Sequence, residues 1–226
     1  MASIIVCLFH VFAVVESIFA LCTYYYFIIG TIDQGYAGPW KYLTFLNMWV
    51  QIACFSLCLL CDLGELLNLG PIVTSLKKAR NLFYSCAALP SCLVVFTTFW
   101  ILYIVDKEMI QPSWVEEFIP SWANHMWHTA ILIVAVDVGF TKYKFPSRTT
   151  GICLSAGYGL SYLAWIMFVQ YYGGFYVYPF LAHLNAFQFV MFVLVELIFT
   201  WSMYFLGEFI NYLTGEDESL STKKKE

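Results

Sequence analysis

Residues 4–29 read IIVCLFHVFAVVESIFALCTYYYFII, an apolar run with a single acidic residue, Glu16. A helix of this length crosses the hydrocarbon core of a bilayer, which is about 30 Å thick. The run lacks the period-two alternation of a barrel strand, which favours a helix. No Lys or Arg precedes it, and it is longer than the apolar region of a secretory signal. The stretch is therefore predicted to be a transmembrane helix.

Composition extends this prediction to the whole chain of 226 residues. Hydrophobic residues make up 61% of the sequence and charged residues only 12%, whereas a soluble domain carries roughly 25% charged residues. Backbone groups in lipid must be hydrogen-bonded within each span. The sequence therefore predicts an all-α polytopic bundle over residues 1–213, followed by a disordered polar tail at 214–226. Six spans are expected, at Ile4–Ile29, Leu43–Leu60, Leu82–Val105, His125–Phe140, Gly151–Tyr171 and Ala186–Phe205.

The positive residues predict the orientation of these spans. Three of the 11 Lys and Arg residues fall in each of the segments 67–81, 141–150 and 214–226. With six spans, all three segments lie on one side, which the positive-inside rule assigns to the cytosol together with both termini. The connection 106–124 is acidic and falls on the other side. There is no basic stripe of the kind that binds nucleic acid, so no nucleic-acid partner is expected.

The chain ends in Lys-Lys-Lys-Glu, with Lys223 and Lys224 at the fourth and third positions from the end. This arrangement is similar to the dilysine signal that returns membrane proteins to the endoplasmic reticulum, and that signal requires a cytosolic tail. An ordinary solvated basic end is the alternative. The sequence is thus compatible with an integral membrane protein of the endoplasmic reticulum or of the plasma membrane.

Two polar residues are predicted to lie at similar depth on different spans. Thr44 follows Trp40 by four residues and His128 follows Trp122 by six, which places them about 6 and 9 Å below the interface. A hydroxyl and an imidazole at one level have the geometry of a nucleophile and its general base. Apolar surroundings favour the neutral imidazole that a base requires.

Structural roles are the alternative for each of these residues. A membrane Thr commonly bonds the carbonyl one turn back, and a lone His commonly bonds another helix. A metal on His125, His128 and His183 would lack an acidic ligand. The group formed by Cys54, Cys58 and Cys61 would lack a His.

Other intramembrane acids suggest a second class of function. Glu16 and Glu196 fall near the middle of the first and last spans, and charged groups at such positions often mark a transport path. Asp62 and Asp137 lie toward the predicted cytosolic end, where snorkelling is cheap, and are expected to be structural. The alternative to an enzyme is therefore a non-catalytic lipid-binding or transport bundle, or a regulatory membrane protein.

An ordered set of motifs resembles one known family over nearly the whole chain. The motifs are WKYLTF at 40–45, FWILY at 99–103, DKEMI at 106–110, IPSWANHMWHT at 119–129, PSR at 146–148, VYP at 177–179 and LGE at 206–208. Together they resemble the androgen-induced / androgen-dependent TFPI-regulating protein family. No single motif is diagnostic, but their order is specific.

The resemblance implies a multi-pass membrane hydrolase of fatty acid esters of hydroxy fatty acids. Matched position by position, it implies Thr44 as the nucleophile and His128 as the general base. Asn124, His125 and Asn47 are candidates for the oxyanion or orienting role. The chain departs from the family pattern at Ala123 and at Met126-Trp127, so the acyl pocket is less securely predicted than the chemistry. No metal or organic cofactor is implied. The expected partners are a lipid ester and membrane lipids, and the sequence names no protein partner.

Overall fold

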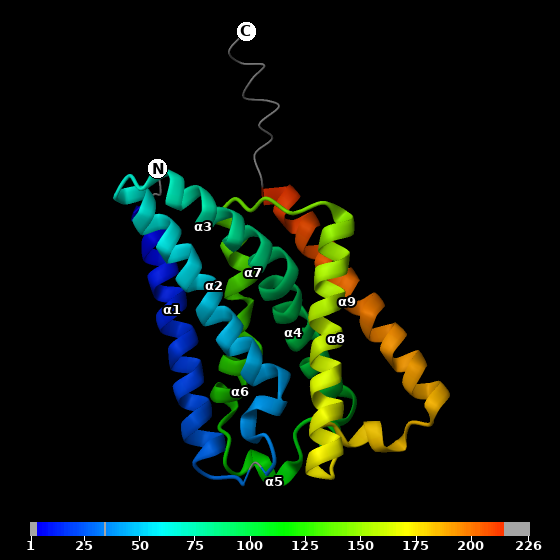
Figure 1. The fold of residues 1–226 in the computed structure, drawn as a ribbon. Coiled ribbons are helices and arrows are strands. Elements are labelled where there is room, and N and C mark those ends of the chain that lie inside the picture. The colour runs from blue at the N-terminus through cyan, green and yellow to red at the C-terminus, as the bar shows by residue number, and fades with distance from the viewer. Residues whose placement is uncertain (1–3, 34, 215–226) are drawn as a thin grey trace.

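The computed structural model describes residues 4–33 and 35–214, and every regular element within them is helical. The long helices are α1 (Ile4–Tyr24), α2 (Leu43–Leu66), α3 (Gly70–Phe83), α4 (Leu89–Asp106), α8 (Arg148–Gly173) and α9 (Ala186–Thr214). They form one bundle (Figure 1). The predicted tail, with Lys223 and Lys224, lies outside the described residues apart from Thr214.

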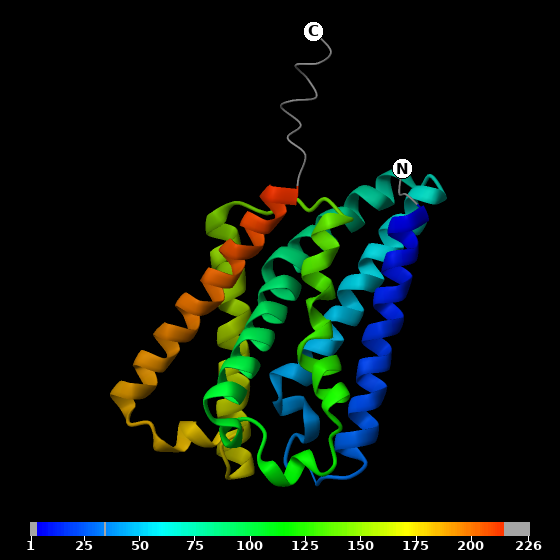
Figure 2. The ribbon, with the colours of Figure 1, turned by 180° about the vertical axis from the view of Figure 1, so that it is seen from behind.

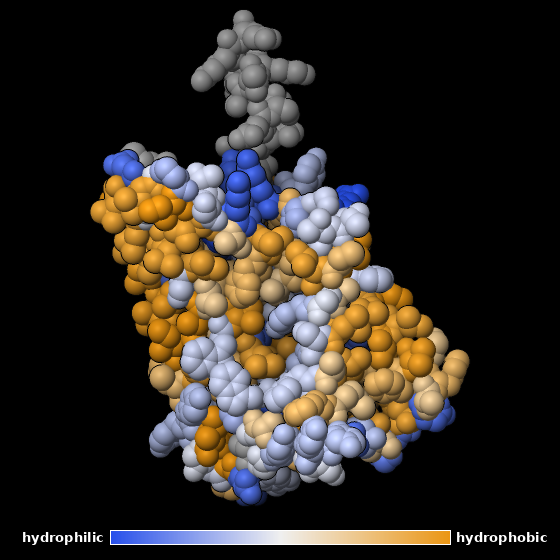
Figure 3. Space-filling model, viewed as in Figure 1, coloured by the Kyte–Doolittle hydropathy of each residue, from blue (hydrophilic) through white to orange (hydrophobic). Residues whose placement is uncertain are grey.

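Five helical stretches are long and apolar enough to cross a membrane: Ile4–Ile29, Leu43–Leu66, Gly70–Asp106, Arg148–Gly173 and Ala186–Thr214. On the face seen in Figure 3, apolar surface covers both flanks beside a weakly polar central band, and the strongly hydrophilic groups gather toward the two ends of the bundle. An apolar flank between two polar ends is the surface that a bilayer requires. The predicted class, an all-α polytopic bundle, is confirmed.

The predicted fourth span, His125–Phe140, is not one helix. The chain crosses the bundle there in short pieces, α6 (Ser121–His128), η5 (Ala130–Leu132), α7 (Ile133–Val136) and η6 (Asp137–Gly139), which run from one end to the other (Figure 2). The 3-10 turns rise about 2.0 Å per residue, which lengthens a short segment. No Gly or Pro lies between Ser121 and Val138, so the sequence gives no warning of the breaks. The polar residues at these breaks instead bond other helices.

The basic connection predicted at 67–81 is also different, because it is mostly helical. Helix α3 begins at Gly70 with Pro71 in its first turn, where the missing proline N–H costs nothing. It continues into α4 through the π-helical turn η3 (Tyr84–Ala88). Pro90 follows this turn and cannot donate to the carbonyl four residues earlier. A π-turn beside a proline is a common way to absorb that loss.

The beginning of α1 and the end of α9 lie at the same end of the bundle (Figure 1). At this end Arg80 donates to the Lys142 carbonyl at 3.3 Å, and Arg148 pairs with Glu208 at 3.2 Å. We call it the basic end. The opposite end, the loop end, carries α5 (Ser113–Glu116). An even number of crossings agrees with the predicted topology, whereas the assignment of the basic end to the cytosol stays a prediction.

Helix α9 touches the rest of the bundle closely at the basic end and leans away from it toward the loop end (Figures 1 and 2). Close approach at the basic end depends on small residues. Gly151 of α8 packs directly against the ring of Tyr204, and Gly207 of α9 packs against Leu89. Small residues of this kind let membrane helices approach each other closely. Beyond these contacts α9 diverges from the rest of the bundle, which leaves room for a cavity.

Candidate active site

Thr44 lies in the first turn of α2, and the segment before it is anchored to α8. Pro39 is the second residue of a short 3-10 helix, η2 (Gly38–Lys41). Tyr162 donates its hydroxyl to the Lys41 carbonyl at 3.0 Å, and Trp165 donates its indole N–H to the Trp40 carbonyl at 2.9 Å. These two bonds fix where α2 begins and therefore where the Thr44 hydroxyl points.

His128 is the last residue of α6, and its ring is held on both sides. Its Nδ1 donates to the backbone carbonyl of Asn124 at 3.0 Å. The ring stacks on Phe99 of α4, with centroids 3.5 Å apart and an interplanar angle of 7°. A hydrogen bond and a stacking partner together leave the imidazole little freedom to rotate.

The two residues meet, with Thr44 Oγ1 3.2 Å from His128 Nε2. A carbonyl oxygen only accepts, so the contact with Asn124 requires the proton to be on Nδ1. In neutral imidazole the other nitrogen then carries a lone pair. Nε2 therefore accepts a hydrogen bond from the Thr44 hydroxyl. This is the arrangement in which an imidazole takes a proton from an attacking alcohol.

Trp127 fixes α6 against α1 beside this pair. Its side chain is 1% exposed. Its indole N–H points to the Thr23 hydroxyl at 3.0 Å and to the Ala20 carbonyl at 3.2 Å. The ring also meets Tyr24 edge-on, with centroids 5.0 Å apart. The bulky residue that departs from the family pattern thus shapes a wall of the site and connects two helices.

The Thr44–His128 pair opens into a cavity of about 670 Å³. Most of the lining is apolar, and it comes from α4, α6, α8 and α9 together with the loop between α8 and α9. Polar groups on its wall include Ser91, Gln111, Asn124, Glu196 and Thr200. A cavity of this size and character suits an apolar ligand with a few polar atoms.

The three residues predicted to assist the pair occupy different places. Asn124 lines the cavity and donates its side-chain N–H to Gln111 Oε1 at 2.5 Å. Asn47 is buried and accepts from Ser91 at 2.9 Å. His125 is exposed and stacks on Trp100, with centroids 4.8 Å apart. The geometry therefore favours Asn124 over His125 as a group near the reacting atoms.

Gln111 is a cavity residue that was not among the predicted site residues. It is 5% exposed and lies in the loop before α5, outside every predicted span. It reaches the cavity because α5 folds back under the loop end of the bundle (Figure 1). Its position in a polar loop gave no signal, since loop amides are ordinarily solvated.

Two acids do not lie as their depth suggested, whereas their expected structural role stays a prediction. Asp62 and Asp137 do not snorkel to an interface, because both are buried and both contact His10 of α1, at 2.6 and 3.1 Å. His10 was missing from the sequence-based set of candidates. Glu196 lines the cavity, whereas both carboxylate oxygens of Glu16 are buried without a hydrogen-bond partner among the described residues.

The alternative metal site on three histidines finds no support in the geometry. Among residues 4–33 and 35–214, no cluster of three potential ligand atoms forms around His125, His128 and His183. His183 is exposed in the 3-10 turn η7 (Pro179–His183).

Comparison with known proteins agrees with the motif order. Residues 5–212 match the family model described as FAR-17a/AIG1-like protein. The chain belongs to this family. It is 32% identical over 201 residues to human androgen-induced gene 1 protein, covering 85% of this chain and 84% of the relative. It is 31% identical over 187 residues to human androgen-dependent TFPI-regulating protein, covering 82% and 81%.

The golden hamster (Mesocricetus auratus) form of the latter is 30% identical over 212 residues, with 91% of each chain covered. No solved structure matches the chain. The family resemblance seen in the motifs is therefore confirmed, and with it the assignment as an integral membrane protein of the FAR-17a/AIG1-like family.

Proposed function

We propose that this protein is a membrane-embedded hydrolase of fatty acid esters of hydroxy fatty acids. The observation that carries the proposal is the 3.2 Å contact between Thr44 Oγ1 and His128 Nε2 at the wall of an apolar cavity. The Nδ1 contact to Asn124 supports it, because it leaves Nε2 free to act as a base.

The proposed reaction is acyl transfer through Thr44. Thr44 Oγ1 attacks the ester carbonyl carbon while its proton passes to His128 Nε2. The tetrahedral intermediate then breaks its bond to the alkoxy oxygen, which takes the proton and leaves as the hydroxy fatty acid. Water, deprotonated by the same nitrogen, attacks the acyl-threonine and releases the fatty acid. Overall, the reaction consumes one water molecule and forms two acids, the hydroxy fatty acid and the fatty acid.

The beginning of α2 offers stabilisation for the oxyanion. Tyr42 caps this helix without a side-chain hydrogen bond, so the cap residue supplies no side-chain acceptor to the first-turn N–H groups around Thr44. The positive end of a helix dipole favours negative charge nearby. Asn124 is the side-chain candidate, because it lines the cavity beside His128. No metal or organic cofactor is part of this scheme.

The substrate class follows from the lining. Long acyl chains suit a cavity that is mainly apolar, and the ester group suits the polar corner at Thr44. Because α9 diverges from α8 toward the loop end and supplies cavity-lining residues such as Val193, we propose that the lipid enters sideways from the bilayer.

The test is hydrolysis of a fatty acid ester of a hydroxy fatty acid by purified protein in detergent. Thr44→Ala and His128→Ala should each lower turnover by a factor on the order of 10³ or more. Thr98→Ala and His125→Ala are matched controls, since Thr98 lines the same cavity and His125 lies three residues from His128. Both controls should retain most of the activity. Full activity of Thr44→Ala would remove the nucleophile from the scheme.

A non-catalytic lipid-binding or transport role is the second candidate, and Glu196 on the cavity wall is the observation that favours it. In that case Glu196→Gln would impair lipid transfer between vesicles while Thr44→Ala had no effect. If the protein is a hydrolase, Thr44→Ala should be the more damaging substitution and Glu196→Gln the less damaging one.

For the location, we propose the endoplasmic reticulum, with the plasma membrane as the alternative. The support is the terminal sequence, in which Lys223 and Lys224 stand at the positions of a dilysine signal. Replacing both with Ser should shift a tagged protein to the cell surface, and an unchanged distribution would argue against the signal.

A further inference from the structure

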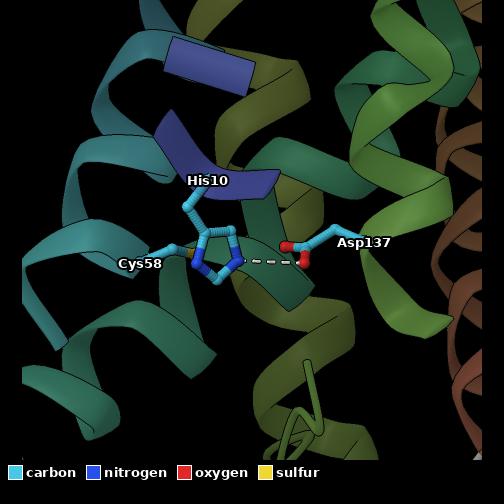
Figure 4. Close-up of side chains that lie close together, drawn as sticks. All are labelled: His10, Cys58 and Asp137. Carbon is cyan, nitrogen blue, oxygen red and sulfur yellow. Dashed lines mark hydrogen bonds and ion pairs between the residues drawn. The ribbon is translucent and has the colours of Figure 1, made fainter. Parts of the chain in front are cut away.

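A second group of chemically reactive side chains lies away from the cavity. It joins His10 of α1, Cys58 of α2 and Asp137 of η6 (Figure 4). All three side chains are buried, and one potential ligand atom from each lies within 4.8 Å of the other two. Nitrogen, sulfur and oxygen donors from three separate elements therefore converge on one point.

Hydrogen bonds hold these donors in a defined arrangement. Asp62 Oδ2 lies 2.6 Å from His10 Nδ1, and Asp137 Oδ1 lies 3.1 Å from Nε2. Tyr143 donates to the other oxygen of Asp137, and its hydroxyl lies 3.2 Å from Cys58 Sγ. If Nδ1 donates its proton to Asp62, the lone pair of Nε2 faces the side where Asp137 lies.

We propose that His10, Cys58 and Asp137 bind a zinc ion. Zinc takes imidazole, thiolate and carboxylate ligands at about 2.0–2.3 Å in a tetrahedron, which places neighbouring ligand atoms about 3.3–3.8 Å apart. Atoms already within 4.8 Å need to move by only about 1 Å to reach that spacing. Two hydroxyl oxygens adjoin these donors: Tyr143 contacts Cys58 and Asp137, and Thr141 Oγ1 lies 3.1 Å from His10 Nε2.

Asp62 has the role that carboxylates commonly take behind a zinc-bound histidine. A ligand histidine usually donates its second ring N–H to a carboxylate, which fixes the tautomer and orients the ring. The 2.6 Å contact between Asp62 and His10 Nδ1 is that arrangement. On binding, the Cys58 thiol would lose its proton to solvent, and the Nδ1 proton would stay between His10 and Asp62.

Charge is compatible with a cation at this point. Two buried carboxylates, Asp62 and Asp137, meet a single imidazole. Zinc bound by the Cys58 thiolate, or a proton on His10, leaves the same single net negative charge, and buried charge is costly unless it is paired. The buried guanidinium of Arg80, 4.9 Å from the Tyr143 ring, supplies a positive charge near the cluster in both states. The competing state is a metal-free ion pair in which His10 is protonated between the two acids.

The zinc would act on structure and not on the ester directly. It would join α1, α2 and the interrupted segment that carries both Asp137 and, nine residues earlier, His128. The sequence alone shows no histidine partner for Cys54, Cys58 and Cys61. The fold brings His10 to Cys58 from 48 residues away.

The experiment measures metal in the purified full-length chain in detergent, after incubation with Zn²⁺ and removal of unbound ion. Elemental analysis should find about one zinc per chain in wild type. Cys58→Ala should hold less than about a tenth of that. Cys61→Ala is the matched control, a buried thiol one turn further along α2, and should bind as wild type does. Asp62→Asn should weaken binding about 10- to 100-fold.

Cobalt gives a spectroscopic readout in the wild-type protein itself, which does not require any variant to fold. Co²⁺-loaded wild type should show intense tetrahedral d–d bands and a sulfur-to-cobalt charge-transfer band, and Cys58→Ser should lose the latter. Wild type that holds less than about 0.1 zinc per chain and shows no cobalt spectrum would overturn the proposal in favour of the metal-free ion pair. Equal loss of zinc in Cys61→Ala and Cys58→Ala would overturn the assignment of the ligand.

Discussion

Replacing Gly151 with Ala should destabilise the bundle, whereas the same change at Gly157 should not. Both residues lie in α8 (Arg148–Gly173). A Cβ at Gly151 would collide with the ring and hydroxyl of Tyr204, which is fully buried on α9 and would have to shift against its neighbours. A Cβ at Gly157 would meet nothing within 4 Å. The pair of variants therefore isolates the close contact between α8 and α9.

The magnitude combines two opposing effects. Ala is favoured over Gly inside a helix by about 0.5–1 kcal/mol, and both variants gain this. Overpacking at Gly151 costs about 1–3 kcal/mol. Gly157→Ala should therefore be more stable than wild type by about 0.5–1 kcal/mol, and Gly151→Ala should be less stable than Gly157→Ala by about 1–3 kcal/mol.

Unfolding of both variants in mixed detergent micelles, followed by tryptophan fluorescence, measures this difference. The divergence of α9 from α8 that opens the cavity depends on their close contact at the basic end. Equal stability of Gly151→Ala and Gly157→Ala would mean that Tyr204 does not pack on Gly151, and the description of this end of the cavity would be wrong.

Three further predictions concern the walls and the loop end. Trp127→Phe removes the indole N–H that reaches α1 and should lower the free energy of unfolding by about 0.5–2 kcal/mol in the same assay. An unchanged free energy of unfolding would mean that other contacts hold α6. Leu163→Trp narrows the cavity and should lower turnover of long-chain esters more than of short-chain esters; equal loss for both would place the acyl chain elsewhere. The Lys107 ammonium lowers the pKa of Glu116 below its ordinary value. The ion pair should therefore stabilise the loop end above that ordinary pKa and lose its effect as pH falls through the lowered pKa. Glu116→Gln should reduce the acid sensitivity of the melting temperature, and an unchanged pH profile would contradict this.

Much of the fold was predictable because lipid restricts the possibilities. The apolar run at residues 4–29 and the counts of Lys and Arg were sufficient for a polytopic helical bundle, since a bilayer leaves few other solutions. Helix ends were harder to predict. The segment from Gly70 is helical although it is basic, because Pro71 lies in the first turn of a helix that runs on into the next span.

The interrupted segment shows where sequence patterns are insufficient. His128 and Asp137 lie at positions where the helix stops or tightens, yet neither is a helix breaker. Their environment is set by partners that are distant in sequence, namely Thr44 and His10. Depth along a span could be counted from flanking tryptophans, so Thr44 and His128 could be singled out together.

The direction in which a side chain faces could not be counted in this way. His125 turns outward, and Asp62 and Asp137 turn inward. Gln111, in a polar loop, was not expected at the cavity at all, because only the fold of α5 under the bundle brings it there.

The most direct test of the central claim is to find the atom that becomes covalently modified. Wild-type protein labelled with a fluorophosphonate bearing a long alkyl chain should yield one adduct, which peptide mass mapping locates on Thr44. Thr98→Ala should label as wild type does, while Thr44→Ala should not label. An adduct on Ser91 or on any residue other than Thr44, or undiminished labelling of Thr44→Ala, would contradict the assignment of Thr44 as the nucleophile.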